Sequence, residues 1–138
     1  MLGIGVMIQT LGGNSASAAA LTKAVGQKIA SVTLSKEYDG ALEFSFDSGY
    51  RMNLHDDGRS CCEHRYMTCD DDLSVHVGAT LLDADVLPAP PVSEDEAHGD
   101  CHEVAFLVVT TSAGKITAET HNEHNGYYGG FWVVAKEM

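Results

Sequence analysis

The stretch ALEFSFDSGYRMNLH, residues 41–55, decides the fold, because apolar and polar side chains alternate on both sides of a short turn. The apolar residues occupy every second position: Leu42, Phe44 and Phe46 before the turn, and Tyr50, Met52 and Leu54 after it. A period of two is typical of a strand with one buried face. Asp-Ser-Gly between two such runs indicates a tight connection. The stretch therefore predicts an antiparallel hairpin.

Similar patterns extend this hairpin in both directions. Further strands are predicted over KIASVTLSK (28–36), ATLLDADVL (79–87), VAFLVVT (104–110), KITAET (115–120) and FWVVAKE (131–137). The continuous apolar run at 104–110 is typical of a central strand buried on both faces. One helix is predicted over SASAAALTKAV (15–25), capped by Asn14 or Ser15 and ended by Gly26, and another over DDLSVHV (71–77), capped by Asp70 or Asp71. We expect an α+β fold: one strongly bent antiparallel sheet of about six strands with two short helices.

The length of 138 residues fits a single domain. Residues 1–13 form a Gly-rich N-terminal arm, and residues 14–138 form the domain, with an exposed loop rich in proline and acidic residues at 88–100. No stretch is long and apolar enough to span a membrane, so no membrane partner is expected. The spacing of the four cysteines fits no small secreted scaffold, which favours reduced thiols in a cytosolic protein.

The charge is strongly acidic and unevenly spread. The formal net charge is −12, with +1 on residues 1–40 and −13 on the remainder. Direct binding to DNA or RNA needs clustered Lys and Arg, so we expect none. An acidic surface serves solubility, or it occupies the nucleic-acid groove of another protein.

Two polar clusters interrupt the strand patterns. The first is RSCCEHRY, 59–66, and the second is HNEHNGYYGG, 121–130. A turn requires one or two special residues, and both clusters carry many more. The candidate ligand-binding residues are Arg59, Glu63, His64, Arg65, His121, Asn122, Glu123, His124, Asn125, Tyr127 and Tyr128.

These residue types suit a small nucleotide. Tyr127 and Tyr128 can stack on a planar ring, and the Asn and Glu side chains can read its polar edges. Arg59 and Arg65 can meet phosphate with bidentate hydrogen bonds.

A metal site and a catalytic site are the alternatives. The potential metal ligands are Cys61, Cys62, His64, His121 and His124. Their spacing matches no zinc template. A cysteine nucleophile is possible in principle, but the chain shows no recognised nucleophile turn. We therefore assign no catalytic residue and no cofactor, and the sequence favours a binding protein over an enzyme.

The segments DDGRSCCEHRYMTCDDDL, 56–73, and HNEHNGYYGGF, 121–131, resemble a family of small uncharacterised bacteriophage and prophage proteins. The resemblance spans about residues 24–134. It implies a phage accessory protein in the cytoplasm of the bacterial host and assigns no reaction. In size and element order the chain is also similar to the sponge proteins that phages use against Thoeris immunity. Those proteins bind cyclic ADP-ribose-type signals without cleaving them.

The leading hypothesis is thus a phage anti-defence protein that sequesters a small cyclic nucleotide or ADP-ribose-type signal. The Gly-rich arm and Trp132 favour a homo-oligomer. Two alternatives stay open: an acidic interaction module, either an inhibitor of a host nucleic-acid enzyme or a minor virion protein, and a metal-dependent hydrolase.

Overall fold

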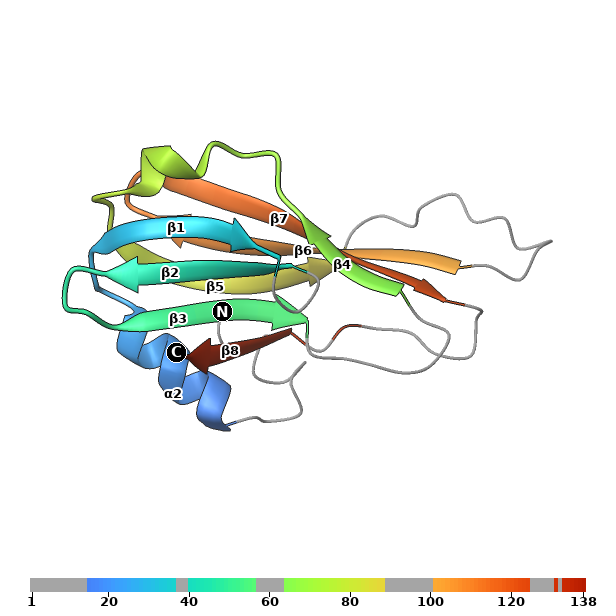
Figure 1. Cartoon of the computed structure of the whole chain (residues 1–138), viewed down its shortest axis with the longest axis horizontal. Helices are drawn as coiled ribbons and strands as arrows, with labels where there is room; N and C mark the ends of the chain where they lie inside the picture. The colour runs from blue at the N-terminus through green and yellow to red at the C-terminus, as the bar shows by residue number, and fades with distance from the viewer. Residues whose placement is uncertain (1–14, 37–39, 57–63, 89–100, 125–130, 132) are drawn as a thin grey trace.

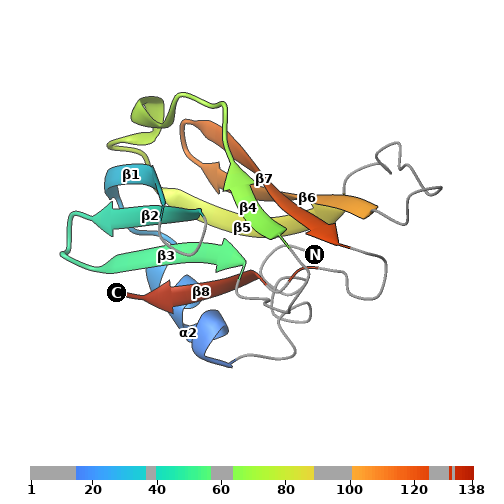
Figure 2. The ribbon, with the colours of Figure 1, turned by 45° about the vertical axis from the view of Figure 1, so that its right-hand side comes forward.

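The protein consists mainly of two antiparallel sheets of four strands each, which lie as two layers in the computed structural model (Figures 1 and 2). The structure describes residues 15–36, 40–56, 64–88, 101–124, 131 and 133–138. Within these residues there are eight strands, one α-helix and one short 3-10 helix.

The first sheet contains the hairpin that the sequence predicts. Its strands run in the order β1 (Ile29–Ser35), β2 (Ala41–Phe46), β3 (Arg51–Asp56) and β8 (Val133–Glu137). Leu42 pairs with Leu54 and Phe44 with Met52, so the apolar faces of β2 and β3 coincide. The hairpin prediction is confirmed.

The second sheet has the order β4 (His64–Thr68), β7 (Gly114–His124), β6 (Cys101–Thr111) and β5 (Leu81–Pro88). The inner residues of β6 pair with inner residues of β7, for example Leu107 with Ala118 and Val109 with Ile116. All four of these side chains are fully buried. The alternate residues of both strands face away from the first sheet.

A single hydrophobic core joins the two sheets. Phe44 and Leu54 from the first sheet and Leu107 from the second are all fully buried in it. The backbone also connects the layers, because Ile29 N–H donates to Ala79 O at 2.8 Å and Leu81 N–H donates to Gln27 O at 3.0 Å.

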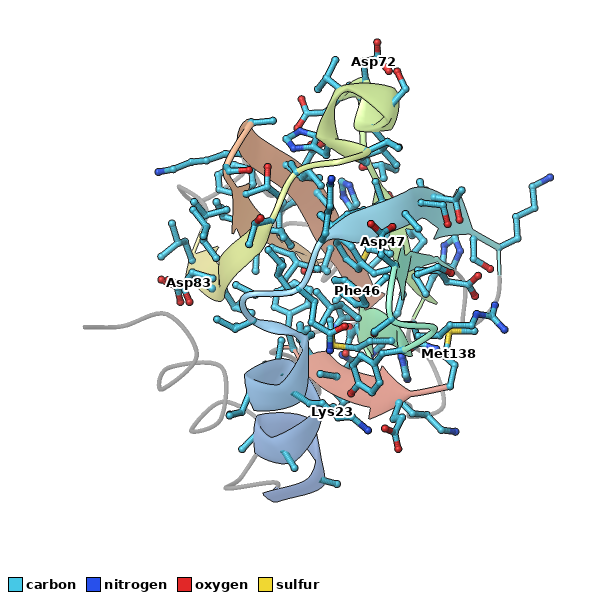
Figure 3. All side chains as sticks on the ribbon, turned by 90° about the vertical axis from the view of Figure 1, so that its left-hand side faces the viewer. Lys23, Phe46, Asp47, Asp72, Asp83 and Met138 are labelled. Carbon is cyan, nitrogen blue, oxygen red and sulfur yellow. The ribbon has the colours of Figure 1, made fainter. Side chains whose placement is uncertain are left out.

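Helix α2 (Ser15–Ala24) covers the outer edge of β8. The Ala135 N–H donates to Ser17 Oγ at 3.2 Å, and the Tyr50 hydroxyl donates to Ala20 O at 3.0 Å. Lys23, labelled in Figure 3, lies over the Tyr50 ring and pairs with Glu137. Gly26 follows the helix with φ +90°, which confirms the predicted end.

The predicted fold class was wrong. The described part of the chain is mostly β, with eight strands in two sheets instead of about six in one bent sheet. The unpredicted strand is β4, which lies inside a segment interpreted as a break in the pattern. Of the two predicted helices, the second is a single 3-10 turn, Leu73–His76, capped by Asp72 and not by Asp70 or Asp71.

The interpretation of VAFLVVT as a strand buried on both faces was also wrong. Strand β6 is an interior strand, and Ala105, Leu107 and Val109 are buried, but Val104, Phe106 and Val108 on its other face are half-buried. The arm at 1–13, Trp132 and loop residues 89–100 lie outside the described residues. Among the residues that the structure describes, no helix is long and apolar enough to cross a membrane.

Candidate functional site

Strands β4 and β7 bring the two polar clusters together. His64 pairs with Glu123, Arg65 with Asn122 and Tyr66 with His121. The strand ends that flank both clusters also lie at the same end of the molecule, where β3 ends, β4 begins, β7 ends and β8 begins (Figure 1). The described parts of the two clusters therefore lie side by side on paired strands, although more than fifty residues separate them in the sequence. The residues on the outer face of these strands form one surface.

An aromatic stack lies at the centre of this surface, on the outer face of the second sheet. The rings of Tyr66 and His121 are nearly parallel, at 6°, with centroids 4.4 Å apart. The His64 ring lies 4.9 Å from Tyr66, tilted by 38°. Because alternate residues of a strand share a face, His64, Tyr66 and Thr68 line up opposite Glu123, His121 and Glu119.

The Tyr66 hydroxyl is held by Glu123. It donates to Glu123 Oε2 at 2.7 Å. This hydrogen bond, together with partial burial and the negative charge of Glu123, raises the pKa of Tyr66 to about 12. The hydroxyl therefore stays protonated at neutral pH and keeps the carboxylate in place.

A second set of polar contacts holds the other side of the stack. Thr68 Oγ1 lies 2.9 Å from His121 Nε2 and 3.3 Å from Glu119 Oε2. The His121 ring is thus positioned from two directions, by the Tyr66 ring and by the Thr68 hydroxyl. We refer to His64, Tyr66, Thr68, Glu119, His121 and Glu123 as the stacked-ring surface.

Arg65 and Asn122 point to the opposite side, between the sheets. Arg65 Nη1 donates to both carboxylate oxygens of Asp56, at 3.1 and 2.8 Å, and both side chains are about nine-tenths buried. Asn122 is fully buried. Of the residues that the sequence assigns to a ligand, these two occupy positions between β3, β4 and β7, and Arg65 is an ion-pair partner of Asp56.

The remaining predicted site residues lie outside the described part of the chain. They are Arg59, Glu63, Asn125, Tyr127 and Tyr128, together with the potential metal ligands Cys61 and Cys62. His124 is described only by its backbone, which pairs with Cys101. Among the described residues, no three His, Cys, Asp or Glu side chains are grouped to hold a metal ion.

Sequence reasoning missed Tyr66, Thr68 and Glu119 as site residues. The signal for the first two was present, because His64, Tyr66 and Thr68 alternate with Arg65 and Met67 in the pattern of a strand. The contribution of Glu119 depends on the register between β4 and β7, which no local pattern contains.

Half-buried apolar side chains and further carboxylates extend the stacked-ring surface across the sheet. Val104 on β6 pairs with His121, and Phe106 pairs with Glu119. On β5, Asp85 pairs with Val108, and Asp83 lies on the same face two residues earlier. An apolar row on β6 is therefore flanked by acidic side chains from both neighbouring strands.

The fold and the surface define a two-sheet β protein with an aromatic and acidic outer face. The chain belongs to the family described as Domain of unknown function (DUF7448), whose model matches residues 22–134. This match covers nearly the same residues as the resemblance stated from the sequence. No curated protein and no solved structure matches the chain.

Proposed function

We propose that this protein is a phage-encoded binding protein that sequesters a small cyclic nucleotide or ADP-ribose-type signal in the host cytoplasm without cleaving it. The observation that carries the proposal is the stack of Tyr66 on His121, bordered by Glu119 and Glu123. This stack is built from the described parts of the two clusters that suggested a ligand site in the sequence.

The chemistry of this surface suits a base and a ribose. Bases stack on aromatic and imidazole rings, and this surface carries three such rings, on the exposed His64 and on the half-buried Tyr66 and His121. Carboxylates are acceptors only, so Glu119 and Glu123 suit the amino groups of a base or the hydroxyls of a ribose.

The phosphate part of the ligand must be bound elsewhere. Glu119 and Glu123 repel phosphate, and the Arg65 guanidinium is paired with Asp56. The proposal leaves this role to Arg59, which follows β3 in the sequence and lies outside the described residues. Sequestration needs tight binding with slow release and requires no activated nucleophile.

Calorimetric titration with cyclic ADP-ribose isomers and cyclic oligonucleotides tests the proposal. We expect one of these ligands to bind and to be recovered intact after the protein is denatured. Stacking contributes about 1–3 kcal/mol per base, so Tyr66→Ala and His121→Ala should each weaken binding roughly 5- to 150-fold. Thr33→Ala, an exposed position on β1 in the other sheet, is the control and should bind as the wild type does. If the wild-type protein binds none of these compounds, the proposal is wrong.

The homo-oligomer is a further part of the proposal. Native mass spectrometry measures the subunit number and any copurified nucleotide in one experiment. A monomer at micromolar concentration would remove the oligomer from the proposal and leave the nucleotide site to be tested by calorimetry.

One observation favours a second candidate, an acidic interaction module. The apolar row of Val104, Phe106 and Val108 is half-buried and flanked by carboxylates. Such a face suits a protein partner with apolar and basic side chains. This candidate predicts that the wild-type protein captures a host protein and that Phe106→Ser abolishes this capture. It also predicts that neither the wild type nor Phe106→Ser binds a nucleotide in calorimetric titrations.

A further inference from the structure

Among the residues that the structure describes, no strand pairs with the side of β5 that faces away from β6, and we call this side the free edge. Strand β5 is the last strand of the second sheet, opposite β4. An edge strand presents unpaired N–H and C=O groups, which can template a strand from another chain. Three features of β5 occupy or distort this edge along its length.

The first feature is backbone pairing at the start of the strand. The Leu81 N–H donates to Gln27 O at 3.0 Å, and the Gly26 N–H donates to Leu81 O at 2.8 Å. Both polar groups of Leu81 therefore point away from β6, toward the segment that precedes β1.

The second feature is an irregularity in the pairing immediately after Leu81. Leu81 pairs with Thr111 and Asp83 with Thr110, so Leu82 has no partner in β6. A bulge of this kind changes which residues face the neighbouring strand. Beyond it, Asp83 and Asp85 direct their backbone groups to β6, whereas Ala84 and Val86 direct theirs to the free edge.

The third feature is the pair of aspartates. The Ala84 N–H donates to Asp83 Oδ1 at 2.8 Å, and the Val86 N–H donates to Asp85 Oδ1 at 2.9 Å. Each carboxylate thus occupies the edge-facing N–H of the residue that follows it. Asp83 lies at the outer margin of β5 in Figure 3.

Two other strand amides also donate to side chains. The Thr117 N–H of β7, beyond the end of β4, donates to Asp71 Oδ2 at 2.7 Å. The Ala135 N–H of β8 donates to Ser17 Oγ. On β5 the groups that cover the Ala84 and Val86 amides come from the strand itself.

We propose that Asp83 and Asp85 close the β5 edge against strand addition by a second copy of this chain. The carboxylates take up the two N–H donors that an added strand would need. Any oligomer of the wild-type protein then forms through another surface.

The test compares two double variants of the full-length protein by analytical ultracentrifugation. Asp83→Ala with Asp85→Ala removes both the acceptors and the charges. Asp83→Asn with Asp85→Asn removes the charges and keeps an acceptor oxygen at each position. We expect the alanine variant to self-associate beyond the wild-type state as concentration rises, and the asparagine variant to match the wild type.

Amide hydrogen exchange gives a readout that does not depend on association. At low concentration, the Ala84 and Val86 amides should exchange roughly tenfold faster in the alanine variant than in the wild type, because a net hydrogen bond is lost. Unchanged exchange of the Leu107 and Val109 amides in the core would show that the variant is folded.

Two results would overturn the inference. If the Ala84 and Val86 amides exchange equally fast in the wild type and the alanine variant, the carboxylates do not hold them. If the asparagine variant self-associates as strongly as the alanine variant, charge repulsion and not N–H capping protects the edge.

Discussion

Replacing Gly40 with alanine should destabilise the protein more than the same change at Gly26, Gly49, Gly78 or Gly114. Gly40 has φ +126°, and an added Cβ would lie 2.7 Å from Met67 Cβ and 2.9 Å from Met67 N. Cβ atoms in proteins essentially never lie this close to a non-bonded heavy atom. The obstacle is the backbone and the first side-chain carbon of β4, neither of which can rotate away.

The magnitude has two parts. A non-glycine residue held at such a φ costs on the order of 1–3 kcal/mol. Overpacking against a fixed neighbour adds about 1–3 kcal/mol. The expected loss for Gly40→Ala is therefore about 2–6 kcal/mol, a large share of the 5–15 kcal/mol typical of natural domains.

Gly114→Ala is the matched control. Gly114 has a similar φ, +136°, and an added Cβ would have no heavy atom within 4 Å. It should incur only the backbone part, about 1–3 kcal/mol. The difference between the two variants therefore isolates the contact between Gly40 and β4.

Urea unfolding followed by circular dichroism measures the difference. The midpoint should fall further for Gly40→Ala than for Gly114→Ala, with similar m-values if both variants unfold in the same cooperative step. Equal midpoints would refute the reasoning, because the approach of Gly40 to Met67 would then have no energetic consequence.

Three further predictions concern the stacked-ring surface and its surroundings. Removing one partner of the Arg65–Asp56 pair should lower the free energy of unfolding by about 3–5 kcal/mol, because the other charge is left buried without its partner. Replacing both residues with apolar ones should lower it much less. A double-mutant cycle in which the two single losses simply add would contradict this prediction. The pKa of Tyr66 is raised from 10.0 to about 12. The stability contributed by the protonated Tyr66 hydroxyl should therefore be present below pH 10 and lost between pH 10 and about 12. Glu123→Gln should move this loss, and the ultraviolet titration of Tyr66, to lower pH; an unchanged titration would show that the hydrogen bond is not responsible. Burial raises the pKa of the Cys69 thiol. In a variant with the other three cysteines changed to serine, Cys69 should therefore react with a disulfide reagent at pH 8 more slowly than a free thiol does. Equal rates would argue against the burial.

Local patterns predicted most of the strands because alternation is a property of neighbouring residues. The hairpin at 41–55, the helix that begins at Ser15 and the strand near 79–87 were predicted close to their final bounds. The strand predicted at 115–120 was found, but it continues to His124. The same reasoning failed for β4, where five residues between two polar segments gave too short a pattern. It also placed the second helix cap one or two residues early, because Asp70, Asp71 and Asp72 offer the same side chain in a row.

Three residues of the stacked-ring surface are among those that the sequence singles out. Sequence composition singled out His64, His121 and Glu123, and the register between β4 and β7 brings all three to one face. It also assigned Arg65 to phosphate, but the alternation of a strand directs that side chain to the opposite face, where Asp56 holds it. One residue of register separates a side chain on the stacked-ring surface from an interior ion pair.

The sequence by itself determined most of the strands, the apolar face of those that alternate, the acidic charge and the two clusters. Only the tertiary structure decided that the strands divide into two sheets, that β4 pairs with β7, and that Asp83 and Asp85 cover the edge of β5. The physical reason is the range of the interactions. Side-chain alternation acts between adjacent residues, whereas strand pairing depends on backbone hydrogen bonds between segments far apart in the chain.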